Sequence, residues 1–144
     1  MSYTLLALVA DLYTPLLIIA LFGMGWQQFK TNQKHQQLKQ VVVSLLLSIL
    51  TSYSLMIADN YWQWWPAFGL DYSTHTAVAF SLQLAIHRVA SKFRWFTWLA
   101  YLSYLVLMWA LNYHSVMDML TTMLSVGLLL QLGAVCKNAR VSNH

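Results

Sequence analysis

The sequence contains no glutamate and only four acidic residues in all. Charged residues make up 8% of the chain, against roughly 25% in ordinary globular proteins, while hydrophobic residues make up 59%. A soluble protein needs charged side chains to cover its surface, so this shortage excludes an ordinary soluble domain. The composition instead predicts an integral membrane protein.

Cysteine is almost absent, because Cys136 is the only one in the chain. An internal disulfide is therefore excluded, and a cysteine-based zinc site is not expected. The formal net charge of +4 might suggest a nucleic-acid partner, but the basic residues sit in short loops between apolar runs and form no continuous stripe. We therefore expect no nucleic acid, no cofactor and no bound metal ion.

Five stretches are apolar enough to form membrane helices, which need about 20 residues to span about 30 Å of hydrocarbon. They cover residues 3–26, 41–58, 74–86, 95–111 and 116–135. No Lys or Arg precedes the first, so we expect a retained transmembrane helix rather than a signal peptide. The third is short and carries Ser81 and Gln83, which we expect to find partners inside the bundle. The sequence thus predicts an all-α membrane fold of about five transmembrane helices, a single domain over residues 1–144.

All the Lys and Arg residues fall on one side of this five-helix topology. They follow the first, third and fifth helices: Lys30, Lys34, Lys39, Arg88, Lys92, Arg94, Lys137 and Arg140. By the positive-inside rule this side is cytosolic, so the N-terminus lies outside and the C-terminus in the cytosol. The outer connection after the second helix is rich in Trp and Tyr, from Tyr61 to Trp65. This is typical of an interfacial aromatic belt, and it could also form a lipid-gripping rim beside an active site.

Two short polar segments lie where the outer ends of helices are predicted. Residues 72–77 lead into the third helix and contain His75, and residues 112–118 lead into the fifth and contain His114 and Asp118. The topology places both segments at the same membrane face. Polar or ionisable groups there are functional candidates, because burying them costs free energy. We therefore predict a site formed by His75, His114 and Asp118.

The spacing of His114 and Asp118 suggests a chemical role. On a helix, residues four apart lie on one face, so the carboxylate could fix the imidazole tautomer and free the other ring nitrogen to attack. His75 would serve as acid and base, protonating the leaving oxygen and then activating water. A single histidine is more often a packing or hydrogen-bonding residue than a catalyst, but the three groups together favour catalysis.

The remaining titratable residues receive simpler interpretations. His35, His87 and His144 fall on the cytosolic side, and we assign them no function. Asp11 lies inside the first predicted helix. Its carboxylate either hydrogen-bonds within the bundle or lines the site.

The two segments resemble the type 2 phosphatidic acid phosphatase superfamily of membrane lipid phosphatases. That family has Pro-Ser-Gly-His at the outer start of one helix and His-x-x-x-Asp at the outer start of a later one. Residues Ser73 to Thr76 look like the first motif, and His114 to Asp118 look like the second. The likeness covers about the second to the fifth helix. It implies that His114 forms a phosphohistidine, that Asp118 orients it and that His75 is the acid and base.

The chain departs from this family in its cations. The Lys-x6-Arg-Pro motif is absent, since no Lys or Arg lies between Lys39 and Arg88, and Met108 stands where an Arg is expected. In the first motif, Thr74 replaces the Gly and Tyr72 replaces the Pro. A related branch, similar to the sphingomyelin synthases, also lacks the full cation set. That branch moves a phosphodiester, which carries less charge than a phosphomonoester.

Other groups must then stabilise the phosphate, because phosphoryl transfer depends on electrostatic stabilisation. The amides at the N-terminus of the third helix form an anion site, and nearby hydroxyl and amide groups add donors. The expected substrate-binding residues are Ser73, Thr74, Thr76, Asn112 and Tyr113. We expect a phosphodiester or diphosphate lipid to be a better substrate than phosphatidic acid.

The sequence therefore predicts a lipid-phosphate phosphatase or phosphotransferase that acts at the outer leaflet through a phosphohistidine. Its expected partner is a lipid with a phosphate or diphosphate headgroup, and its expected location is the inner (cytoplasmic) membrane, with the site facing the periplasm or exterior. Two alternatives stay open. A catalytically degenerate member would keep the fold for lipid binding or complex assembly. A metal or haem protein is the other, in which His75, His114 and Asp118 would form a two-histidine, one-carboxylate metal site.

Overall fold

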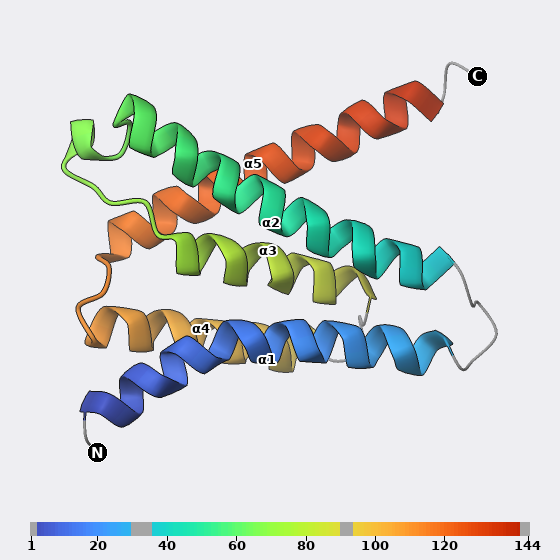
Figure 1. Ribbon diagram of the computed structural model, residues 1–144, viewed down its shortest axis with the longest axis horizontal. Coiled ribbons are helices and arrows are strands. Elements are labelled where there is room, and N and C mark those ends of the chain that lie inside the picture. Colours follow the sequence, from blue (N-terminus) through green and yellow to red (C-terminus); the bar gives the residue numbers. More distant parts are fainter. Residues whose placement is uncertain (1–2, 30–35, 90–93, 142–144) are drawn as a thin grey trace.

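The chain folds into five α-helices in a computed structural model that describes residues 3–29, 36–89 and 94–141 (Figure 1). The helices are α1 (Tyr3–Phe29), α2 (Gln36–Trp62), α3 (Thr74–Val89), α4 (Arg94–Ala110) and α5 (Val116–Val141). A short 3-10 helix, η1 (Pro66–Phe68), lies between α2 and α3. The described residues contain no strand. The predicted all-α fold with five helices is confirmed.

Three of the helices are long and apolar enough to cross a membrane. The qualifying stretches are Tyr3–Trp26 in α1, Val41–Trp62 in α2 and Val116–Gly133 in α5. Large apolar side chains along α1 remain 47–67% exposed: Leu5, Leu8, Leu12, Leu16 and Ile19. Contiguous apolar surface of this extent is unfavourable in water and suits a lipid environment. These features indicate a multi-pass membrane protein.

The helices α3 and α4 are shorter, with 16 and 17 residues. At about 1.5 Å per residue, each falls short of the roughly 30 Å of hydrocarbon. The helix α3 lies at the centre of the bundle and contacts each of the other four helices (Figure 1). Its neighbours therefore shield it from the surroundings, which allows it to carry polar side chains.

The two polar side chains of α3 for which partners were predicted, Ser81 and Gln83, each donate one hydrogen bond, while Oε1 of Gln83 is buried without a partner among the described residues. Gln83 is fully buried, and its Nε2 donates a hydrogen bond to Thr97 Oγ1 of α4 at 2.8 Å. Ser81 Oγ donates to the carbonyl oxygen of Val78 at 2.9 Å. Hydrogen bonds between side chains of neighbouring helices stabilise helix association in membranes, so the bond from Gln83 joins α3 to α4.

The helix ends form two groups at opposite ends of the bundle (Figure 1). One end holds the start of α1 and the connections α2–α3 and α4–α5, and the other holds the start of α2, the start of α4 and the C-terminus of α5. Three basic residues are exposed at this second end: Lys39, Arg88 and Arg94. Three others lie outside the described residues: Lys30, Lys34 and Lys92. The last two belong to α5, where only their backbone is described: Lys137 and Arg140.

Asp59 holds the connection between α2 and α3 in place. Its side chain is buried, and its Oδ1 accepts a hydrogen bond from the Trp65 N–H at 2.8 Å. Trp65 is only 7% exposed, and its Nε1 donates to Thr121 Oγ1 of α5 at 3.0 Å. The predicted aromatic belt therefore does not include Trp65, which packs against the bundle. Three neighbours do stay exposed: Tyr61, Trp62 and Trp64.

Candidate functional site

Ser73 fixes the start of α3, two residues before His75. Its Oγ accepts a hydrogen bond from the Thr76 N–H at 3.2 Å and donates to Thr76 Oγ1 at 2.8 Å. Such an N-cap satisfies an amide that the first helical turn would otherwise leave unpaired. Ser73 and Thr76 are both fully buried. Their hydroxyls hold the helix start, and the structure differs here from the prediction that they face a substrate.

Ser115 and Asp118 form a similar structure at the start of α5. The Ser115 N–H donates to Asp118 Oδ2 at 2.7 Å, and the Asp118 N–H donates to Ser115 Oγ at 3.1 Å. This reciprocal pair is a capping box. Because α5 begins at Val116, His114 precedes the helix and does not stack on Asp118 as their spacing predicted. The Nδ1 of His114 is buried and has no hydrogen-bond partner among the described residues.

Asp118 also contacts the segment that leads into α3. Its second carboxylate oxygen, Oδ1, accepts a hydrogen bond from the Asp71 N–H at 2.8 Å. One turn further along α5, Thr122 Oγ1 accepts a bond from the Ser73 N–H at 3.2 Å. Asp118 therefore joins two segments that each carry a histidine. Its carboxylate holds the backbone of both segments, and the Nδ1 of His114 makes no bond to it among the described residues.

Asn112 ends α4 and turns the chain toward the site. Its φ of 55° is left-handed, a conformation that Asn tolerates better than most residues. The Tyr113 N–H donates to the Met108 carbonyl at 3.1 Å, and the Asn112 N–H donates to the Trp109 carbonyl at 2.9 Å. This is the Schellman pattern of helix ends. The role of Asn112 in the structure is thus to direct Tyr113 and His114 away from the axis of α4.

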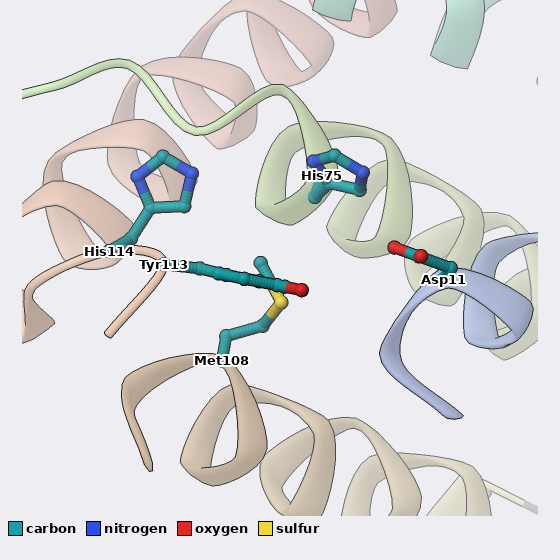
Figure 2. Close-up of a pocket in the computed structure, with 5 residues that line it drawn as sticks. All are labelled: Asp11, His75, Met108, Tyr113 and His114. Carbon is teal, nitrogen blue, oxygen red and sulfur yellow. The ribbon is translucent and has the colours of Figure 1, made fainter. Parts of the chain in front are cut away.

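His75 and His114 line a single cavity of about 310 Å³ at this end of the bundle. They are 39 residues apart in the sequence, at positions 75 and 114. The cavity is lined by Asp11, His75, Met108, Tyr113 and His114. Figure 2 shows both imidazoles beside the cavity, while the ring of Tyr113 extends across it toward the side of Asp11. The predicted convergence of the two histidine segments is thus present in the fold.

A second cavity of about 210 Å³ adjoins the first and shares Asp11 and His75 with it. Its other lining residues are Thr14, Tyr53, Thr74 and Val78. Thr74 is thus the expected substrate-binding residue of the α3 start that lines one of these two described cavities. Sequence analysis left two roles open for Asp11, and the structure places it in the walls of both cavities. The signal for this was an acidic residue within an otherwise apolar run.

The surroundings of His114 favour its neutral form. Burial lowers the pKa of His114 below its usual value of 6.5, and His75 lowers it further, while the carboxylates of Asp118 and Asp71 act in the opposite direction. A neutral imidazole is the form that a nucleophile requires. Since Nδ1 is enclosed, Nε2 is the candidate nitrogen for contact with a ligand.

Among the described residues, the lining of the first cavity contains two imidazoles, a carboxylate and a phenol, but no Lys or Arg. Met108, at the position where an Arg was expected, is almost fully buried. Within the described ranges, no group of three or more His, Cys, Asp or Glu side chains is arranged to hold a metal ion. Comparison of the chain with models of protein families, with curated proteins and with solved structures finds no match.

Proposed function

We propose that the protein is a membrane enzyme that transfers or hydrolyses the phosphoryl group of a lipid. The observation that carries this proposal is the meeting of His75 and His114 in one cavity at one end of the bundle. A pair of imidazoles is suited to a reaction in which one attacks and the other manages protons. The resemblance of their segments to the lipid phosphatase motifs points to phosphorus as the atom attacked.

The proposed membrane orientation places the cavity at the outer face. The cavity lies at the end that holds the start of α1, while the described basic residues Lys39, Arg88 and Arg94 lie at the opposite end. By the positive-inside rule the basic end faces the cytosol. With α3 and α4 also crossing, as five alternating spans require, the site faces the periplasm or exterior at the headgroup level of the inner membrane.

In the proposed reaction, Nε2 of His114 attacks phosphorus, and an N–P bond forms as the bond to the leaving oxygen breaks. The imidazolium of His75 donates its proton to that oxygen. His75 then takes a proton from water or from an acceptor alcohol, whose oxygen attacks the phosphohistidine and releases His114. Asp118 keeps the two segments together through the backbone hydrogen bonds that its carboxylate accepts.

Phosphate release by purified protein is the experiment that tests this function. A panel of phosphomonoester, diphosphate and phosphodiester lipids is compared in the wild type and in His114→Ala and His75→Ala. His87→Gln is the matched control, since His87 lies at the opposite end of α3 and accepts a bond from Trp98 Nε1. We expect release in the wild type and in His87→Gln, and a loss of about a hundredfold or more in the two cavity variants.

Phosphatidic acid and an acceptor alcohol belong in the same panel. Faster turnover of phosphatidic acid than of all phosphodiester and diphosphate lipids would contradict the expected preference for low charge. No turnover of any lipid, with or without an acceptor alcohol, would reject the enzyme.

The absence of Lys and Arg from the cavity lining favours one second candidate, a catalytically degenerate lipid-binding or assembly protein. Such a protein would keep its cellular role when His114 is replaced by Ala. Complementation of a deletion strain by His114→Ala, at wild-type protein levels, therefore separates the two functions. Loss of the role in a folded variant supports the enzyme.

A further inference from the structure

Asp11 introduces a negative charge into a cavity whose lining has no permanent cation. It comes eight residues after Tyr3, where α1 begins, and thus about 12 Å along the helix. Its carboxylate points into the space that His75 and Tyr113 also border (Figure 2). An ionised carboxylate at such a depth in a membrane is costly unless an opposite charge accompanies it.

The second cavity, which Asp11 also lines, presents hydroxyl oxygens. Thr14 lines this cavity, and its side chain lies beside the buried hydroxyl of Tyr104, with which it can share a hydrogen bond. Tyr53 and Thr74 add hydroxyl groups to the second cavity. Carboxylate and other oxygen atoms are the ligands that hard cations prefer.

A bound phosphate would make the charge imbalance worse. The proposed function brings at least one further negative charge into the cavity that Asp11 already lines. Two like charges at close range repel, and strongly so where water is excluded. The two imidazoles provide positive charge only when protonated, and a nucleophilic His114 has to be neutral. In the proposed reaction the imidazolium of His75 is then the one positive charge that the described lining offers, against the charges of both Asp11 and the phosphate. The described lining therefore supplies fewer positive charges than the negative charges that the proposed chemistry brings together.

We propose that Asp11 binds a cation beside the phosphate, and that this cation supplies the charge which Lys and Arg do not provide here. This inference rests on the proposed function. The cation has two possible sources. A divalent metal ion can bridge Asp11 and a phosphate oxygen, as Mg²⁺ commonly does with one or two carboxylates and a substrate phosphate. The ammonium of a zwitterionic headgroup can instead pair with Asp11, with the ring of Tyr113 beside it.

The metal source is tested by direct binding. Mn²⁺ is titrated into the purified full-length protein and followed by electron paramagnetic resonance, for the wild type, Asp11→Asn and Asp71→Asn. Asp71 is exposed and lines neither cavity, so Asp71→Asn controls for a general loss of negative charge. If a metal is the cation, one Mn²⁺ binds per chain, and Asp11→Asn lowers the affinity for Mn²⁺ by about tenfold or more. Removal of the metal by a chelator then abolishes turnover.

The ammonium source is tested with two phosphodiester lipids of equal chain length, one zwitterionic and one with an uncharged alcohol in place of the ammonium. Binding of short-chain forms is measured beside turnover at pH 7.5. If the headgroup is the cation, the wild type and Asp71→Asn prefer the zwitterionic lipid by about tenfold or more. Asp11→Asn loses this preference, and chelation has no effect.

The inference is overturned if wild type and Asp11→Asn bind no Mn²⁺ and treat the two lipids alike. Both binding measurements work without turnover, so a protein that releases no phosphate can still pass or fail this test. Conversely, turnover that is unchanged in Asp11→Asn rejects the cation and leaves the proposed function standing. Should Asp11→Asn fail to fold, Thr14→Val removes a neighbouring oxygen and should weaken whichever cation binds.

Discussion

In the proposed reaction His114 has to be neutral to attack phosphorus, and its neighbours act on its protonation in opposing directions. Burial lowers its pKa below 6.5, whereas Asp118 and Asp71 raise it. A group with a lowered pKa loses its proton at lower pH, so neutral His114 persists into mildly acidic solution. We expect the acidic limb of kcat/KM to lie below pH 6.5, measured as a pH–rate profile.

Replacement of Asp71 by Asn offers a signed test of this account. Asp71 raises the pKa of His114, so its removal should lower that pKa further and move the acidic limb to still lower pH. Above the limb, near pH 7.5, the rate should match the wild type. A shift of the limb toward higher pH would contradict the electrostatic assignment.

Asp118 contributes to stability as well as to the geometry of the site. Its carboxylate accepts backbone bonds from Asp71 at 2.8 Å and from Ser115 at 2.7 Å. Replacement by Ala leaves both amides without this acceptor and should lower the free energy of unfolding by about 1–3 kcal/mol. Thermal unfolding in detergent measures the loss.

Asn at position 118 retains one oxygen acceptor and should lose less stability than Ala. The carboxylate charge of Asp118 raises the pKa of His114, so Asp118→Asn should also move the acidic limb of the pH–rate profile to lower pH. An unchanged profile would contradict this electrostatic effect and leave Asp118 a purely structural role.

At the scale of elements, α1 and α2 approach closely where Gly25 meets Val41. A Cβ on Gly25 would lie 2.8 Å from Val41 Cγ2, a distance at which either the Val41 side chain or one of the two helices must shift. Val41 is fully buried, and a β-branched side chain has little rotamer freedom in a helix. We expect Gly25→Ala to destabilise the protein by about 1–3 kcal/mol.

Gly23 provides the matched control, because a Cβ there meets nothing within 4 Å. Gly23→Ala should leave the unfolding temperature unchanged or raise it slightly through helix propensity. Val41→Ala combined with Gly25→Ala should recover part of the loss. Equal effects of the two glycine substitutions would show that the close approach of α1 and α2 is not what Gly25 serves.

Apolar run length predicts the helices because hydropathy is a local property of the chain. It underestimates their length where polar residues continue a helix, as in α2, which extends from Gln36 to Trp62 against the predicted 41–58. The two caps of the site also have local signals, Ser73 followed by Thr76 and Ser115 followed by Asp118, three residues apart. The hydrogen bond between the Asp71 amide and Asp118 has no such local signal, because these two residues are 47 positions apart in the chain.

The site shows the same division between local and long-range information. That His75 and His114 fall at one end of the bundle follows from helix count, and the fold brings both to one cavity. That Asp11 joins them depends on how α1 packs against α3, which no local pattern encodes. Helix packing therefore adds a carboxylate to the cavity wall and leaves Asp118 to hold the backbone.

At the scale of the whole molecule, the proposed function requires the cavity to face outward. The end with the cavity also carries η1, where Phe68 is 82% exposed. The opposite end carries the last turns of α5 with Cys136, the only cysteine.

In intact spheroplasts, a membrane-impermeant thiol reagent should label Phe68→Cys in a Cys136→Ala background and should leave wild-type Cys136 unlabelled. Lysis should then expose Cys136. The positive-inside rule is the physical basis, because Lys39, Arg88 and Arg94 all lie at the end of Cys136. The opposite labelling pattern would place the histidines at the cytosolic leaflet, and the substrate would then have to be a cytosolic-leaflet lipid.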